Sequence, residues 1–140
     1  MNLTIRKNDY LIINLIFAGL IVILILYSFI FSAEGINYPV PSAGEWITGQ
    51  TLPSTGLSRS FSEIVRLEFD RARKYNPYGI RIFSFFMIQL LLRIAGSVLA
   101  LYVRAGRLRT AIISDALCSS FLFVLCFWPF LVFFVRQLIQ

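Results

Sequence analysis

The residues of this chain that could do chemistry are few, and two of them lie inside long apolar runs. Arg93 and Asp115 each interrupt such a run. Charge inside a bilayer is costly, so a charged side chain there pairs with another group or lines a path for an ion or proton. A proton path generally uses carboxylates or histidines in series, whereas the apolar runs hold a single acid. We therefore expect a structural role for Arg93 and Asp115, with a transport path as the alternative.

Arg93 belongs to a stripe of polar and small residues. Gln89, Arg93, Gly96 and Ala100 follow one another at spacings of 4, 3 and 4, which places them on one face of a helix. Small and polar residues on one face are typical of close helix packing in lipid. Asn14, in an earlier apolar run, is expected to make a helix–helix hydrogen bond of the same kind.

Two partners are open for Asp115. At about 1.5 Å of rise per residue, the depths of Arg93 and Asp115 in their runs differ by roughly 7 Å, which an arginine side chain can cover. Helical side chains lean toward the helix N-terminus, which here carries Arg93 away from Asp115. Arg109 is nearer in sequence and is the other partner that we consider.

The remaining reactive residue types do not form a catalytic set. Histidine, the commonest general base and metal ligand, is absent. Cys118 and Cys126 are eight residues apart in one apolar run, about 12 Å along a helix and beyond disulfide reach. Serines and threonines between residues 54 and 62 suit turn and cap positions. No phosphate loop, cofactor motif or metal-ligand spacing is present, so we expect no catalytic residue, no cofactor and no metal.

Three long apolar runs must position these residues. The chain has 140 residues, of which 58% are hydrophobic, and about 20 apolar residues cross a bilayer as a helix. The runs cover about residues 10–31, 80–103 and 110–135. The first run is longer than a signal-peptide core, so a retained helix is favoured over a cleaved signal. We predict an all-α integral membrane protein with three transmembrane helices, forming one module over residues 1–140.

The connector between the first two runs divides into an irregular loop, residues 34–59, and an amphipathic helix, residues 60–75. Ser60 and Glu63 have the form of a capping box. Apolar side chains recur at helical spacing, which predicts a helix lying at the membrane surface or on a partner. The residues expected to make that contact are Arg59, Phe61, Ile64, Val65 and Phe69. Asn76 and Pro77 end the helix, since the residue before proline resists helical geometry.

The net charge of +6 does not indicate nucleic-acid binding, because the basic residues flank apolar runs and no nucleic-acid fold signature accompanies them. Basic residues at Arg6, Lys7 and in the segment 104–109 favour a cytoplasmic N-terminus. Five further basic residues in the first connector weaken that assignment. A bacterial cytoplasmic membrane is the expected location.

The connector also resembles a known family. Its segment "LPSTGLSRSF", with "NP" and an apolar run downstream, is similar to small bacterial membrane proteins of unknown function built around Cys-Pro-x-Cys-Gly-Leu-Thr-Arg and a later Asn-Pro. The resemblance covers about residues 52–93. Leu52 and Thr55 stand where that family has cysteines, so any thiol chemistry of the family is not expected here. The resemblance implies an architecture, not an activity.

These observations together predict a non-enzymatic accessory or assembly subunit of a bacterial membrane complex. Its expected partners are the lipid bilayer and other membrane subunits or a second copy of itself, with no nucleic acid and no metal. A small homo-oligomeric channel or transporter using Gln89, Arg93 and Asp115 is the alternative. A membrane enzyme with its site at the turn from Leu52 to Arg59 is the third and weakest hypothesis.

Overall fold

The computed structural model describes residues 7–33, 52–102 and 105–139, and all the secondary structure in these ranges is helical. Three long helices, α1 (Lys7–Ile30), α5 (Gly79–Tyr102) and α6 (Ala105–Ile139), are accompanied by two short ones, α3 (Leu57–Val65) and α4 (Phe69–Tyr75). The expected irregular loop up to residue 51 lies outside the described residues.

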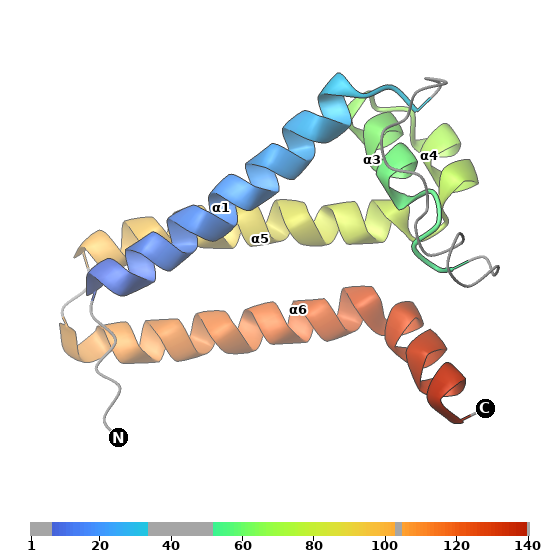
Figure 1. Ribbon diagram of the computed structural model, residues 1–140. Helices are drawn as coiled ribbons and strands as arrows, with labels where there is room; N and C mark the ends of the chain where they lie inside the picture. Colours follow the sequence, from blue (N-terminus) through green and yellow to red (C-terminus); the bar gives the residue numbers. More distant parts are fainter. Residues whose placement is uncertain (1–6, 34–51, 103–104, 140) are drawn as a thin grey trace.

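The three long helices are each long and apolar enough to cross a membrane. Helix α5 lies between α1 and α6 and packs on both, while α1 and α6 scarcely touch (Figure 1). The start of α1, the end of α5 and the start of α6 lie at one end of the bundle, and α3 and α4 lie at the other (Figure 1). The third helix is longer than expected at both ends, because residues 105–109 and 136–139 continue it.

The predicted helix over residues 60–75 is two helices. It begins earlier, at Leu57, and breaks after Val65. The N–H of Leu67 donates to the carbonyl of Ile64 at 3.0 Å, and that of Glu68 to the carbonyl of Glu63 at 3.0 Å. These two bonds and the φ of +65° at Leu67 make a Schellman ending, usually formed by glycine. The predicted capping box is wrong, since Gly56 occupies the N-cap and Ser60 lies buried inside the helix.

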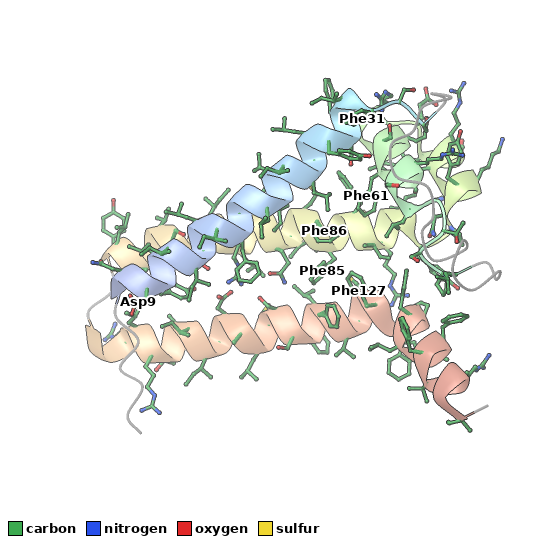
Figure 2. All side chains as sticks on the ribbon, in the orientation of Figure 1. Asp9, Phe31, Phe61, Phe85, Phe86 and Phe127 are labelled. Atoms are coloured by element: carbon green, nitrogen blue, oxygen red, sulfur yellow. The ribbon has the colours of Figure 1, made fainter. Side chains whose placement is uncertain are left out.

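A small apolar core joins α3 and α4 to the long helices. Phe61, Ile64, Ala72 and Ile82 are buried together, and the ring of Phe61 packs edge-on against that of Phe86 at 6.0 Å (Figure 2). Phe61 and Ile64 were expected to face lipid or a partner. They face the protein's own core instead, because α3 lies across α5 with its apolar side inward.

The polar side of α3 completes the end of α1. Arg66 donates to the carbonyls of Ser28 at 3.3 Å and Phe29 at 2.9 Å, and the Ser62 hydroxyl donates to the carbonyl of Phe31. The last carbonyls of a helix have no partner within it, and a cation there also suits the helix dipole. Arg66 is thus a cap for α1.

The Asn-Pro pair ties the turn before α3 to the start of α5. Asn76 donates from its amide nitrogen to the carbonyls of Pro53 and Thr55, both at 2.8 Å, and its side-chain oxygen accepts from the N–H of Tyr78 at 2.8 Å. Gly56 has a φ of +73°, and a Cβ there would lie 2.5 Å from the carbonyl oxygen of Tyr75. Segments about twenty residues apart are therefore joined in one closed turn.

Helix α6 bends toward its C-terminal end (Figure 1) and contains Pro129. Proline has no N–H, so the carbonyl four residues earlier, that of Leu125, loses its helical partner. The guanidinium of Arg81, from the first turn of α5, donates to that carbonyl. Pro129 thus leaves the carbonyl of Leu125 without a helical donor, and Arg81 supplies a donor in its place.

Candidate functional site

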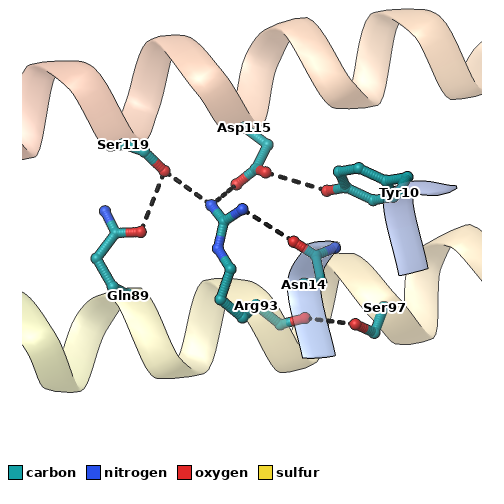
Figure 3. Close-up of polar contacts among 7 residues, drawn as sticks. All are labelled: Tyr10, Asn14, Gln89, Arg93, Ser97, Asp115 and Ser119. Carbon is teal, nitrogen blue, oxygen red and sulfur yellow. Dashed lines mark hydrogen bonds and ion pairs between the residues drawn. The ribbon is translucent and has the colours of Figure 1, made fainter. Parts of the chain in front are cut away.

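A cluster of polar side chains lies between the three long helices (Figure 3). Helix α1 contributes Tyr10 and Asn14, α5 contributes Gln89 and Arg93, and α6 contributes Asp115 and Ser119, so every long helix supplies two members. The side chains of Arg93 and Asp115 are 11% and 14% exposed, while Asn14 is fully buried. The cluster is therefore held inside the bundle and away from its outer surface.

Arg93 is the centre of the cluster. One terminal nitrogen lies 2.5 Å from a carboxylate oxygen of Asp115 and 2.8 Å from the hydroxyl of Ser119. The other terminal nitrogen donates to the side-chain oxygen of Asn14 at 2.9 Å. One guanidinium thus contacts both neighbouring helices, which its planar, multiply donating head permits.

Asp115 is bound from two sides. Its second carboxylate oxygen accepts a hydrogen bond from the Tyr10 hydroxyl at 3.1 Å. Its first carboxylate oxygen contacts Arg93. Beside this pair, the Ser119 hydroxyl donates to the side-chain oxygen of Gln89 at 3.2 Å. The structure therefore pairs Asp115 with Arg93 and Tyr10, rather than with Arg109.

Removing a charge from water costs several kcal/mol, and only close pairing with further hydrogen bonds offsets that cost. Here the two charges compensate each other, and both oxygens of Asp115 already accept hydrogen bonds. A proton relay needs an acceptor that is free to take the proton. This geometry is suited instead to fixing the three helices against one another.

Small residues of α5 let α1 come close to the cluster. A Cβ on Gly96 would lie 2.7 Å from the Tyr10 hydroxyl and 3.3 Å from the amide nitrogen of Asn14. Ala100 is buried with Tyr10 and Leu108. The stripe seen in the sequence thus faces α1 and α6. Its polar residues, Gln89 and Arg93, lie near the middle of α5, and its small residues, Gly96 and Ala100, lie closer to the C-terminal end of that helix.

A cavity of about 650 Å³ adjoins the cluster. It lies between α1 and α6 with α5 as its floor. Its polar part is formed by the side chains of Tyr10, Gln89, Arg93, Asp115 and Ser119. The rest of the wall is apolar apart from one hydroxyl, and it comes from Ile13, Phe17, Leu20, Ile21, Leu24, Phe85, Phe86, Ile112, Ala116 and Ser120.

Three nitrogen atoms of the cluster have no hydrogen-bond partner among the described residues. They are the side-chain amide nitrogens of Asn14 and Gln89 and the Nε of Arg93. All three are donors, whereas the oxygens of the same amides are occupied. A buried donor without a partner costs about 1–3 kcal/mol, so the cluster holds more N–H groups than it can satisfy by itself.

The other residues expected to form contacts lie around α3 and α4. Arg59 is exposed in the first turn of α3 and Val65 is partly buried at its end. Phe69 is 44% exposed at the start of α4. With Phe61 and Ile64 buried, the exposed apolar surface of this region moves to Leu67, which is 75% exposed, and to Phe69.

Tyr10 was not recognised from the sequence, and neither was the hydrogen bond from Arg93 to Ser119. Tyr10 precedes Asn14 by four residues and Asp115 precedes Ser119 by four, so each pair lies on one helical face. That spacing was the available signal. Among the described residues, no group of three or more histidine, cysteine, aspartate or glutamate side chains gathers to hold a metal, and Cys118 and Cys126 are both free thiols.

The family resemblance of residues 52–93 stays a prediction, because no comparison with known proteins tests it. No protein-family model, curated protein or solved structure matches the chain.

Proposed function

We propose that this protein is a non-enzymatic accessory or assembly subunit of a bacterial membrane complex. The observation that carries the proposal is the pairing of Arg93 with Asp115 between α5 and α6, extended to α1 through Asn14 and Tyr10. The two charged side chains inside the apolar helices therefore serve to join the three helices. The surface left for a partner is then the outside of the bundle, including its α3–α4 end.

Docking through the α3–α4 end is the second part of the proposal. Leu67 and Phe69 are exposed beside the charged side chains of α4, namely Asp70, Arg71, Arg73 and Lys74. Exposed apolar side chains among charged ones fit a membrane interface or a partner's surface. The docking surface that we propose therefore lies on α4 and the break before it, while the apolar side of α3 faces the protein's own core.

The ends of the bundle support an orientation. The start of α1 and the start of α6 lie at the same end of the bundle (Figure 1), and Arg107 and Arg109 lie in the first turns of α6. Basic residues close to helix ends favour the cytoplasmic side. We infer a multi-pass protein of the bacterial cytoplasmic membrane with its N-terminus in the cytoplasm and α3–α4 on the outer side.

The test is purification of tagged protein from its native membrane in a mild detergent, after chemical crosslinking. We expect a stoichiometric complex larger than the monomer and its micelle. Phe69→Ser should release the partner without changing the melting temperature. Tyr102→Ser, which alters an 83% exposed side chain at the opposite end, should leave the complex intact. A monomer that brings down no partner would overturn the proposal, and conductance in liposomes lost with Arg93→Leu would favour the channel instead.

A further inference from the structure

We propose that the cleft between α1 and α6 binds a neutral, lipophilic molecule through a carbonyl oxygen that accepts hydrogen bonds from Gln89 and Arg93. This site is separate from the α3–α4 end and goes beyond the role of an assembly subunit. The proposal rests on three observations: the cavity that forms this cleft, the N–H groups of Gln89 and Arg93 that have no hydrogen-bond partner, and the position of Arg93 near the middle of α5.

The leftover groups define the polar part of the ligand. Gln89 and Arg93 both line the cavity, and each carries an N–H without a partner. Gln89 is 8% exposed, and its terminal torsion is soft, so its amide can turn toward an acceptor without moving the helix. Because only donors are unfilled, the complementary group is an acceptor such as a carbonyl oxygen.

The charge of the cluster excludes an ionic ligand. Arg93 and Asp115 compensate each other at 2.5 Å, so the polar part of the cleft is neutral overall. A carboxylate or phosphate would have to enter apolar surroundings without a free counter-charge, at a cost of several kcal/mol. A ketone, ester or quinone carbonyl meets the same N–H groups without that cost.

The depth of Arg93 excludes a phospholipid head group. Arg93 lies 14 residues after Gly79 and 9 before Tyr102 in α5, or about 21 Å and 14 Å along the axis. That is near the middle of a hydrocarbon core about 30 Å thick. Head groups and glycerol esters of bilayer lipids lie at its boundary. The occupant is therefore a compound whose carbonyl can reside within the hydrocarbon, such as an isoprenoid quinone or a neutral fatty ester.

The walls fit a tail and not a whole helix. They extend along α1 from Tyr10 to Leu24, about 21 Å of helix, which suits an extended acyl or isoprenoid chain. The volume of about 650 Å³ is within the range of roughly 300–1,000 Å³ for small-molecule sites. A 20-residue helix about 10 Å wide fills on the order of 2,400 Å³, so the cleft can enclose a tail but not a whole partner helix.

The experiment uses purified, delipidated full-length protein and three probes: decylubiquinone, methyl palmitate and hexadecane. Binding is followed by native mass spectrometry and by the shift in melting temperature. We expect one-to-one binding of at least one carbonyl probe and at least tenfold weaker binding of hexadecane. Decylubiquinone alone would identify a quinone-type ligand, methyl palmitate alone an ester, and both the shared carbonyl chemistry.

Variants locate the site. Gln89→Leu should raise Kd about tenfold, the value of one hydrogen bond. Ala116→Phe should abolish binding by filling the cleft, while Leu117→Phe, on a side chain 67% exposed and outside the cavity wall, should not. Ser120→Phe fills the same cleft from the next turn and replaces Ala116→Phe if that variant does not fold.

Three results would overturn the inference. They are no binding of either carbonyl probe, equal binding of hexadecane, and binding that persists in the filled cleft. A partner protein lost with Ala116→Phe, with no probe bound to the wild type, would assign the cleft to a protein. None of these results touches the complex formed through Phe69, so failure here and failure of the assembly role are distinguishable.

Discussion

The polar cluster in the middle of the bundle and the α3–α4 end both join segments that are far apart in the chain, but with different partners. At the α3–α4 end, Arg66 and Asn76 bind backbone carbonyls left open by helix ends and turns. In the polar cluster, Arg93 binds side chains of α1 and α6. Backbone carbonyls are placed by the fold itself, whereas side-chain partners depend on how each helix is rotated.

This difference explains why the cluster is the more vulnerable region. A carbonyl at a helix end that loses its side-chain donor can turn to water or to a neighbouring N–H. A guanidinium in apolar surroundings has no such substitute, and it cannot lose its proton. Substitutions in each region test that contrast, and those that remove a charge should have the largest effect.

Asp115→Leu is expected to have the largest effect. The change leaves Arg93 uncompensated, and the free energy of unfolding should fall by about 3–5 kcal/mol, measured by titration with SDS in mixed micelles. The double variant Arg93→Leu/Asp115→Leu should recover most of the loss, because apolar side chains can replace a buried pair. Equal losses in the single and double variants would show that the pair does not hold the helices.

The sequence predicted the long helices well because their signal is local. A run of apolar residues predicts a helix whatever surrounds it, and the bounds of α1 and α5 differ from expectation by a few residues. The break at Leu67 could not be predicted, since leucine is not a typical residue for a left-handed helix end. The side of α3 that carries Phe61 was recognised as apolar, but sequence periodicity does not say whether an apolar face meets lipid, a partner or the chain's own core.

The polar cluster was predicted only in outline. The stripe from Gln89 to Ala100 follows from spacing alone, so it could be read from the sequence. Whether Arg93 reaches Asp115 depends on the relative height and rotation of α5 and α6, which the sequence left open between two partners. Tyr10 belongs to the cluster because α1 packs closely against α5 at Gly96. Tyr10 and Gly96 are more than eighty residues apart in the sequence, so this contact could not be predicted from local spacing.

Asn76→Ala tests the α3–α4 end. It removes three hydrogen bonds of a side chain that is 2% exposed, so the free energy of unfolding should fall by about 2–3 kcal/mol. Asn76→Asp should be nearly as harmful, because it keeps the acceptor for Tyr78 but sets a negative charge against two carbonyl oxygens. Asn8→Ala, on an exposed asparagine, is the matched control and should have little effect. A loss smaller for Asn76 than for Asn8 would contradict the closed turn.

Gly79→Ala asks how tightly α3 packs on α5. The new Cβ would lie 1.9 Å from the Ser60 hydroxyl oxygen and 2.6 Å from its Cβ, so α3 has to shift. Overpacking of this kind costs about 1–3 kcal/mol, to be measured as a lower melting temperature. Ser60→Gly should rescue the variant in part. Gly19→Ala, where a Cβ meets nothing within 4 Å, should be neutral or slightly stabilising.

The smallest expected effect has the opposite sign. Leu67 holds a φ of +65°, a conformation that costs a residue with a Cβ about 1–2 kcal/mol and glycine almost nothing. Leu67→Gly should therefore stabilise the fold by about 1 kcal/mol in the same SDS titration, whereas Leu67→Ala should bring no such gain. The absence of a gain with glycine would mean that the leucine side chain supports the core.

Leu67 also belongs to the docking surface that we propose, because its side chain is 75% exposed beside Phe69. The stabilised Leu67→Gly variant should therefore lose partner binding in the crosslinking experiment, together with Phe69→Ser and in contrast to Tyr102→Ser. Gaining stability and losing the partner in one substitution would separate docking from folding. A stabilised variant that kept its partner would remove Leu67 from the docking surface and leave Phe69 and the basic side chains of α4 to carry it.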